Sequence, residues 1–198
     1  MRTALFLTAA VLTAACSGSD AAEETAQTDT VAPAAEALAT QTTPQTPAVT
    51  DPQIADIVVA ANEVDIAAGE MARTRAADAE VKTFAEKMVT DHTGVNQAAS
   101  ELVGRLGVTP EPNATSDQLR RGGEQNRAAL EGQSGAAFDR AYIDQEVAYH
   151  QAVLDAIDQT LIPSATNGEL RALLQQTRPA VDAHLQHARQ IQARLGGS

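Results

Sequence analysis

Apolar residues recur every three to four positions through most of the chain beyond residue 50. The segment Val81–Leu106 shows this pattern most clearly, with apolar residues at Val81, Phe84, Ala85, Met88, Val95, Ala99, Leu102, Val103 and Leu106. At about 3.6 residues per turn these positions form one continuous stripe on a helix that faces a core. His92 lies in the middle of the stripe. Because an unpaired buried polar group costs about 1–3 kcal/mol, we expect His92 to meet a partner across the core.

The same periodicity predicts four long helices in all. They are expected from Asp51 to about Ala77, from Asp78 to Leu106, from Gly135 to Leu161 and from about Glu169 to Leu195. The first three have residues suited to N-caps at their starts, namely Asp51, Asp78 and Ser134. Gly107 is suited to end the second helix, with Pro110 beyond it.

Between the second and third helices the pattern weakens. Ser116–Leu130 is only weakly helical, and Gly122-Gly123 interrupts it, so we expect a long crossover segment there. No stretch alternates with a period of two for long enough to form a strand. The chain is therefore predicted to be all-α, a four-helix bundle with a crossover segment between helices 2 and 3.

Several ionisable groups fall on the apolar faces of these helices, near the midpoints. Projection at about 100° per residue places five of them inward: Asp65, His92, Glu146, His150 and His184. In an up-down bundle the midpoints of the helices coincide, so these side chains are expected to meet at one level of the core. His187 projects to the flank of its helix and is expected to be solvated.

The residues around these positions form four motifs. They are Asn62-x-x-Asp65-Ile66-x-x-Gly69-x-x-Ala72, Phe84-Ala85-x-x-Met88-Val89-x-Asp91-His92, Phe138-Asp139-x-x-Tyr142 with His150, and Pro179-x-x-x-x-His184-Leu185. The chain therefore resembles a bacterial family of exported proteins that share a domain of unknown function and are often named as outer-membrane proteins. The resemblance implies a ferritin-like four-helix bundle and export, and it implies no established reaction. Asp65 stands where the family commonly has glutamate.

One hypothesis for the five inward groups is a metal site. Imidazole and carboxylate ligands suit Fe, Mn, Zn or Cu, and ferritin-like bundles build metal sites in their cores. Asp91 would orient one of the imidazoles from outside the ligand set. Paired Glu-x-x-His motifs are absent, because Glu146 and His150 are four residues apart and neither His92 nor His184 follows a glutamate by three. A single metal ion is thus favoured over a two-metal centre.

The alternative is a buried hydrogen-bond network without chemistry. The inward carboxylates and histidines would then pair with one another and with Tyr142 and Tyr149, and so fix the register of the helices. No serine or cysteine nucleophile has a recognisable activating motif, and no glycine-rich phosphate loop is present. The sequence therefore favours a protein without enzymatic activity and names no catalytic residue.

The first fifteen residues, Met1–Ala15, have an early arginine, an apolar run and small residues before Cys16. The run is shorter than the roughly 20 apolar residues of a membrane-spanning helix, so a cleaved signal peptide is predicted. Leu12-Thr13-Ala14-Ala15-Cys16 resembles a bacterial lipobox, which implies a lipid on Cys16, the only cysteine of the chain. Ordinary cleavage that leaves a free thiol is the alternative. Ser17 in the position after Cys16 favours the outer membrane over the inner one.

Residues 16–50 are expected to form the lipidated cysteine and a disordered acidic linker, because the segment has no lysine or arginine and almost no large apolar residue. Residues 51–198 form the predicted bundle. With 14 basic residues against 26 acidic ones, the chain is not expected to bind nucleic acid. The combined prediction is a lipid-anchored envelope protein facing the periplasm, in metal handling or the stress response, or else a structural module for an unidentified partner. The sequence specifies no oligomeric state.

Overall fold

The computed structural model describes residues 49–197, and every regular element within that range is helical. The elements are α1 (Asp51–Arg75), α2 (Ala79–Leu106), α3 (Ala114–Glu131), α4 (Gly135–Ala156), the π-helical η1 (Ile157–Leu161), α5 (Ile162–Ser164) and α6 (Gly168–Gly196). Among the described residues there is no strand. The all-α prediction is confirmed.

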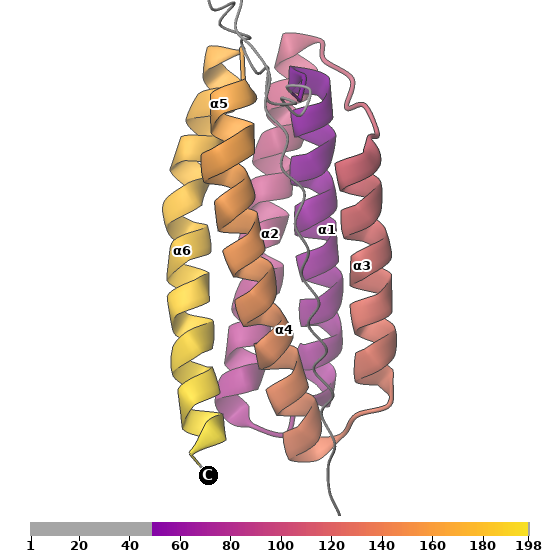
Figure 1. The fold of residues 1–198 in the computed structure, drawn as a ribbon, viewed down its shortest axis with the longest axis vertical. Helices are drawn as coiled ribbons and strands as arrows, with labels where there is room; N and C mark the ends of the chain where they lie inside the picture. The colour runs from indigo at the N-terminus through magenta and orange to yellow at the C-terminus, as the bar shows by residue number, and fades with distance from the viewer. Residues whose placement is uncertain (1–48, 198) are drawn as a thin grey trace, which may run out of the picture. The chain divides into compact units, whose positions relative to one another are not determined.

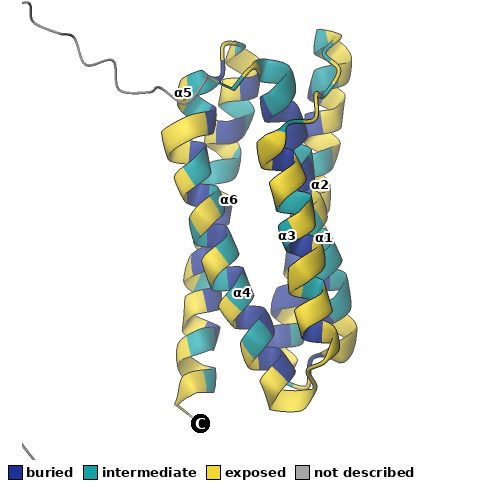
Figure 2. Ribbon diagram, turned by 45° about the vertical axis from the view of Figure 1, so that its right-hand side comes forward, coloured by how far each residue is buried: buried dark blue, intermediate teal, exposed yellow. Residues whose placement is uncertain are grey.

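The long helices lie alongside one another, as Figure 1 shows. Helices α2 and α4 run in one direction, and α1, α3 and α6 run in the other. Helix α1 packs mainly on α2 and α3, whereas α4 packs mainly on α6. In Figure 2 the buried positions face the space that these helices share.

The buried apolar side chains form two clusters at different heights. The first, called the aliphatic cluster here, includes Ile54, Ile57, Val58, Leu154, Ile157, Leu161, Leu170, Leu174, Val181 and Leu185. The second, the aromatic cluster, includes Phe84, Phe138 and Tyr142 together with Val81, Met88, Leu130, Ile143 and Ile191. The middle of each of the helices α1, α2, α4 and α6 lies between the two clusters.

The start of α1 differs from the prediction. Thr50, not Asp51, is the N-cap, and its backbone N–H donates to Gln53 Oε1 at 3.2 Å. The Asp51 carboxylate instead accepts hydrogen bonds from the backbone N–H groups of Thr166 at 2.8 Å and Asn167 at 2.9 Å. It therefore joins the first turn of α1 to the turn before α6.

The predicted caps of the second helix are confirmed. Asp78 accepts hydrogen bonds from the backbone N–H groups of Glu80 and Val81, and so satisfies two of the free donors at the start of α2. Gly107 ends α2 in the left-handed conformation with φ 64°, which glycine adopts without steric cost.

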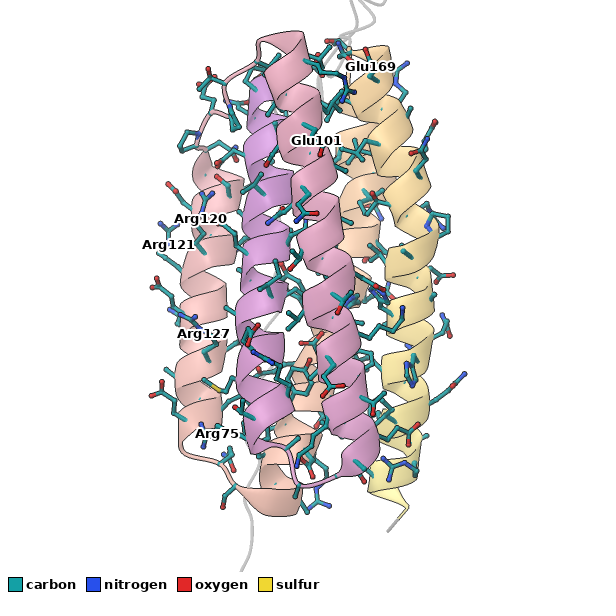
Figure 3. The ribbon with its side chains drawn as sticks, turned by 180° about the vertical axis from the view of Figure 1, so that it is seen from behind. Arg75, Glu101, Arg120, Arg121, Arg127 and Glu169 are labelled. Carbon is teal, nitrogen blue, oxygen red and sulfur yellow. The ribbon has the colours of Figure 1, made fainter. Side chains whose placement is uncertain are left out.

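The predicted interruption at Gly122-Gly123 was wrong, because α3 is continuous through both glycines. A Cβ atom on Gly123 would lie 2.7 Å from the Val64 side chain, so this glycine lets α3 approach α1 closely. Arg120 lies one turn earlier on α3 (Figure 3), and its guanidinium binds both carboxylate oxygens of Asp56 at 3.0 and 3.1 Å. Helix α3 is thus fastened to α1.

Helix α4 continues into η1 and α5, and the winding changes along this stretch. It is α-helical to Ala156, π-helical over Ile157–Leu161, and α-helical again to Ser164. The π-helical stretch directly precedes Pro163, which has no N–H to donate to the i−4 carbonyl of an α-helix. Such stretches occur frequently at functional sites.

No helix within residues 49–197 combines the length and apolar character needed to cross a membrane. The predicted signal peptide, Cys16 and the linker through residue 48 lie outside the described residues, so they stay predictions.

Candidate metal centre

The structure brings the five inward groups together between the aliphatic and aromatic clusters. They come from four helices: Asp65 from α1, His92 from α2, Glu146 and His150 from α4, and His184 from α6. We call them the His–carboxylate cluster. None is more than 6% exposed. Five ionisable side chains are therefore removed from water at one level of the core.

Two of the three imidazoles lie against the Asp65 carboxylate. Asp65 Oδ2 lies 3.0 Å from His92 Nε2 and 3.4 Å from His150 Nε2. The ring centroids of the three histidines are 5.3–5.7 Å apart. One ring nitrogen of each histidine lies within 4.8 Å of those of the other two. This spacing allows all three nitrogens to contact a single ion between them.

The tautomer of His92 follows from Asn62, one turn before Asp65 on α1. Asn62 Nδ2 donates to the backbone carbonyl of Val58 at 2.8 Å, which turns Asn62 Oδ1 towards the ring of His92. His92 Nδ1 lies 2.7 Å from this oxygen and must donate to it. The lone pair of neutral His92 is therefore on Nε2, the atom that faces Asp65.

The other two imidazoles are oriented in the same manner. His150 Nδ1 donates to the backbone carbonyl of Glu146 at 3.0 Å, and His184 Nε2 donates to Asp91 Oδ2 at 2.8 Å. Asp91 is fixed in turn by Lys87 Nζ at 2.6 Å. Each ring thus donates from one nitrogen, and its second nitrogen carries a lone pair. Donation from the distal nitrogen of a histidine to an oxygen is the usual support for a metal ligand.

When Asp65 is ionised, the three lone-pair nitrogens receive no hydrogen bond. They are His92 Nε2, His150 Nε2 and His184 Nδ1, and all three are buried. Both oxygens of Asp65 and Glu146 Oε2 are likewise buried. Native structures leave few buried polar atoms without hydrogen bonds, so several of them gathered at one place require a physical explanation.

The carboxyl groups of the cluster favour their protonated forms. Burial raises the pKa of Glu146 to about 8. Burial, together with the nearby charge of Glu146, raises the pKa of Asp65 well above its ordinary value. Near neutral pH the metal-free cluster therefore holds protons that a cation would displace.

Two of the imidazoles favour their neutral forms. Burial and the neighbouring histidines together lower the pKa of His92 to about 3. Burial also lowers the pKa of His184, although its hydrogen bond to Asp91 opposes the change. Neutral imidazoles keep their lone pairs, so His92 and His184 present metal ligands rather than positive charges near pH 7.

The residues predicted to support the cluster, Asp91, Tyr142 and Tyr149, make different contacts. Asp91 contacts His184, as described above. The Tyr149 hydroxyl donates to the backbone carbonyl of Ala61 at 2.8 Å, so it links α4 to α1, and its ring meets that of His150 edge-on. The Tyr142 hydroxyl is buried, and its burial and the nearby charge of Glu146 both raise its pKa. His187 is 35% exposed and lies outside the cluster.

Sequence reasoning did not identify Asn62 as a functional residue. The available signal was its position three residues before Asp65, which places both side chains on the same face of α1. Which imidazole its amide orients depends on where α2 lies, and that is a tertiary property.

Of three comparisons with known proteins, one gives a match. The model of a family described as "Domain of unknown function (DUF4142)" matches residues 21–191, a span that contains the whole His–carboxylate cluster. No curated protein and no solved structure matches the chain.

Proposed function

The chain belongs to the DUF4142 family of unknown function, and we propose that it binds one transition-metal ion at the His–carboxylate cluster. One observation carries the proposal. Three imidazole nitrogens from three helices are buried without hydrogen-bond partners, while the opposite nitrogen of each ring donates to an oxygen. An ion bound by these nitrogens would satisfy all three.

The chemistry of the donor set suits a divalent transition metal. Imidazole and carboxylate ligands favour Fe, Mn, Zn or Cu over Mg or Ca, which prefer oxygen alone. An ionised Asp65 would complete the set with negative charge, because its Oδ2 faces two of the ligand nitrogens. Metal binding would then release protons from the buried carboxyl groups, so affinity is expected to rise with pH.

The geometry favours one ion over two. A second set of possible ligands, Asp65, Glu146 and His150, also has its atoms within 4.8 Å of one another. Both sets use His150, however, and its Nδ1 already donates to the carbonyl of Glu146. The single free nitrogen of His150 can serve one ion at a time.

The arrangement of the helices supports the finer proposal of a ferritin-like bundle. Helices α1, α2, α4 and α6 supply all five residues of the cluster, and α3 contributes none. Helix α3 returns the chain from the end of α2 to the start of α4 (Figure 1), which is the place of a crossover connection. In this proposal the four ligand-bearing helices are the bundle, and α3 is its helical crossover.

We further propose that the bundle is exported and attached to a membrane by a lipid on Cys16, facing the periplasm, in metal handling or the stress response. The sequence of Met1–Cys16 supports this part. Labelling with radioactive palmitate in a Gram-negative host tests it, since wild type is expected to incorporate label and Cys16→Ser is not. A labelled Cys16→Ser variant, or an unlabelled wild type, would contradict the anchor.

A second candidate function is a purely structural network, and the raised pKa values favour it. Protonated Asp65 and Glu146 can each donate one hydrogen bond, so protons rather than an ion would join the cluster. The cluster would then fix the positions of the helices, and the acidic surface would meet a partner of the envelope.

Metal content separates the two functions. The untagged protein, purified without chelator from metal-replete cells, is expected to carry about one equivalent of metal. The double variant His92→Ala/His150→Ala should carry none, whereas His187→Ala, which changes the histidine outside the cluster, should match wild type. Circular dichroism confirms that each variant is folded. Metal-free wild type that also fails to bind added Fe, Mn, Zn and Cu would contradict the metal proposal.

A further inference from the structure

A cavity of about 130 Å³ extends from the His–carboxylate cluster into the aliphatic cluster. Most of its lining is apolar, with side chains from every long helix, among them Ile57, Val95, Leu119, Val153, Leu173 and Val181. Native cores are close-packed and rarely leave a void larger than a water molecule. A volume of this size in the middle of the bundle is therefore a distinct feature of the fold.

One end of the cavity lies against the His–carboxylate cluster. Asp65, His92 and His150 line it, together with Asn62 and Tyr149. Nε2 of both histidines is fully buried, so neither lone pair is exposed to the cavity. The surface that the cavity presents is therefore almost wholly apolar.

The opposite side of the cavity reaches the surface between α3 and α4. Thr115 and Ala152 line it and are exposed, and Leu119 beside them is half-buried. The π-helical stretch supplies two further lining residues, Ile157 and Leu161. The wall of the cavity is therefore built partly from η1, the π-helical segment that continues α4.

We propose that this cavity binds a small aromatic hydrocarbon of single-ring size, with the ring among the apolar side chains. The volume sets the size, because an engineered apolar cavity of about 150 Å³ in another protein takes up benzene. The lining sets the polarity, because a hydroxyl group buried here would lose its hydrogen bonds to water without gaining new ones.

The proposal goes beyond metal binding and does not depend on it. The contacts of the ring involve only apolar side chains. It is therefore tested on the full-length protein after removal of metal with chelator. Phenol and benzene are the probes, and their binding is measured by isothermal titration calorimetry.

Wild type is expected to bind benzene saturably at one site and phenol more weakly, because the buried hydroxyl of phenol would find no partner. Ala156→Phe fills the cavity from α4 and should weaken both affinities by about tenfold or more, since the added ring takes the place of the probe. Ala148→Phe is the matched control, because Ala148 lies on the same helix, is exposed and does not line the cavity. It should leave both affinities unchanged.

A second obstruction guards against misfolding of Ala156→Phe. Leu119→Trp enlarges a half-buried residue at the mouth of the cavity on a different helix, and it should also weaken both probes. Absence of saturable binding to wild type, or unchanged affinity in both obstructed variants, would overturn the cavity as the binding site. Phenol binding as tight as that of benzene would overturn the apolar character of the site. A protein that binds the probes but never binds metal would contradict only the metal proposal.

Discussion

The aromatic and aliphatic clusters are built mainly on α1, α2, α4 and α6. The aromatic cluster is tightly packed, whereas the aliphatic cluster borders a cavity. In the aromatic cluster Phe84, Phe138 and Tyr142 are fully buried, with Tyr142 edge-on to Phe84 and stacked on Phe138. Gly69 brings α1 and α2 together there, since a Cβ atom would lie 2.9 Å from the Val89 side chain. The aliphatic cluster instead borders the cavity and the π-helical stretch.

This difference shows how a bundle can hold ligands firmly and still leave room beside them. The His–carboxylate cluster lies at the boundary between the two ends. Glu146 is one turn from Tyr142 on α4, so the tightly packed end fixes the helix that carries both Glu146 and His150. On the other side the cavity borders Asp65, His92 and His150. Four changes test this comparison.

The largest effect is expected from Phe84→Ala in the aromatic cluster. Phe84 has no exposed surface, and its ring contacts those of Tyr142 and His187. Truncation of a well-packed phenylalanine costs about 3–5 kcal/mol, because the surrounding side chains collapse only partly into the gap. Urea denaturation of the full-length protein measures the loss. A loss below about 1 kcal/mol would mean that this end is not tightly packed.

The next effect concerns the boundary itself and depends on pH. The pKa of Glu146 is about 8 in the folded protein against 4.5 for an ordinary glutamate, so between these values the folded state holds a proton that the unfolded chain releases. The contribution of Glu146 to the stability of the metal-free protein is therefore full below about pH 4.5 and is lost as the pH rises towards 8. His92, with its pKa lowered to about 3, acts in the opposite direction, because stability falls as the pH drops below 6.5.

Glu146→Gln should remove much of the loss of stability at the alkaline side. Urea denaturation at a series of pH values, after treatment with chelator, provides the comparison. The control is Glu86→Gln, which changes an exposed glutamate of α2. A variant whose profile is as steep as that of wild type between pH 4.5 and 8 would show that Glu146 does not carry this proton.

A smaller effect is expected where α3 covers the cavity side of α1. Gly123→Ala places a methyl group against the stiff, branched side chain of Val64 and should cost about 1–3 kcal/mol. Gly122→Ala is the matched control, because a Cβ atom there meets open space, and alanine should stabilise the helix by up to about 1 kcal/mol. Thermal unfolding shows the two signs directly. Equal shifts in both variants would mean that α3 does not approach α1 through Gly123.

The smallest effect is expected at the cavity. Leu173 is half-buried and faces a space that is already present, so Leu173→Ala should cost about 1 kcal/mol or less. Leu185→Ala, in the same aliphatic cluster but 1% exposed, should cost about 2–5 kcal/mol. Urea denaturation compares the two variants. Equal losses would indicate that the aliphatic cluster closes over the cavity in solution.

The meeting of the five cluster residues could be predicted because face and height are local properties of a helix. Asp65, His92 and His184 each interrupt an apolar stripe near the middle of a helix, and helices of similar length bring their midpoints together. The support of the cluster was partly accessible in the same way. Asp91 lies next to His92 in the chain, at the edge of the helix face.

The remaining features depend on contacts between distant segments. Gly122-Gly123 carries the local signal of a broken helix, and only the position of Val64 shows why Gly123 belongs inside one. The hydroxyl of Tyr149 has its acceptor on α1, and the amide of Asn62 has its imidazole on α2. A cavity leaves no pattern in the sequence, because it is the space that side chains from several helices fail to fill.

The carboxylate of Asp51 has a mechanical consequence for the point at which the chain enters the helices. Beyond its two backbone donors it also accepts a hydrogen bond from the Thr166 hydroxyl, so three bonds tie this point to the turn before α6. A tensile force on the chain at Thr50 would therefore not peel α1 away one turn at a time. The force would be shared with α6, and the bonds at Asp51 would have to break together before the first helix could unwind.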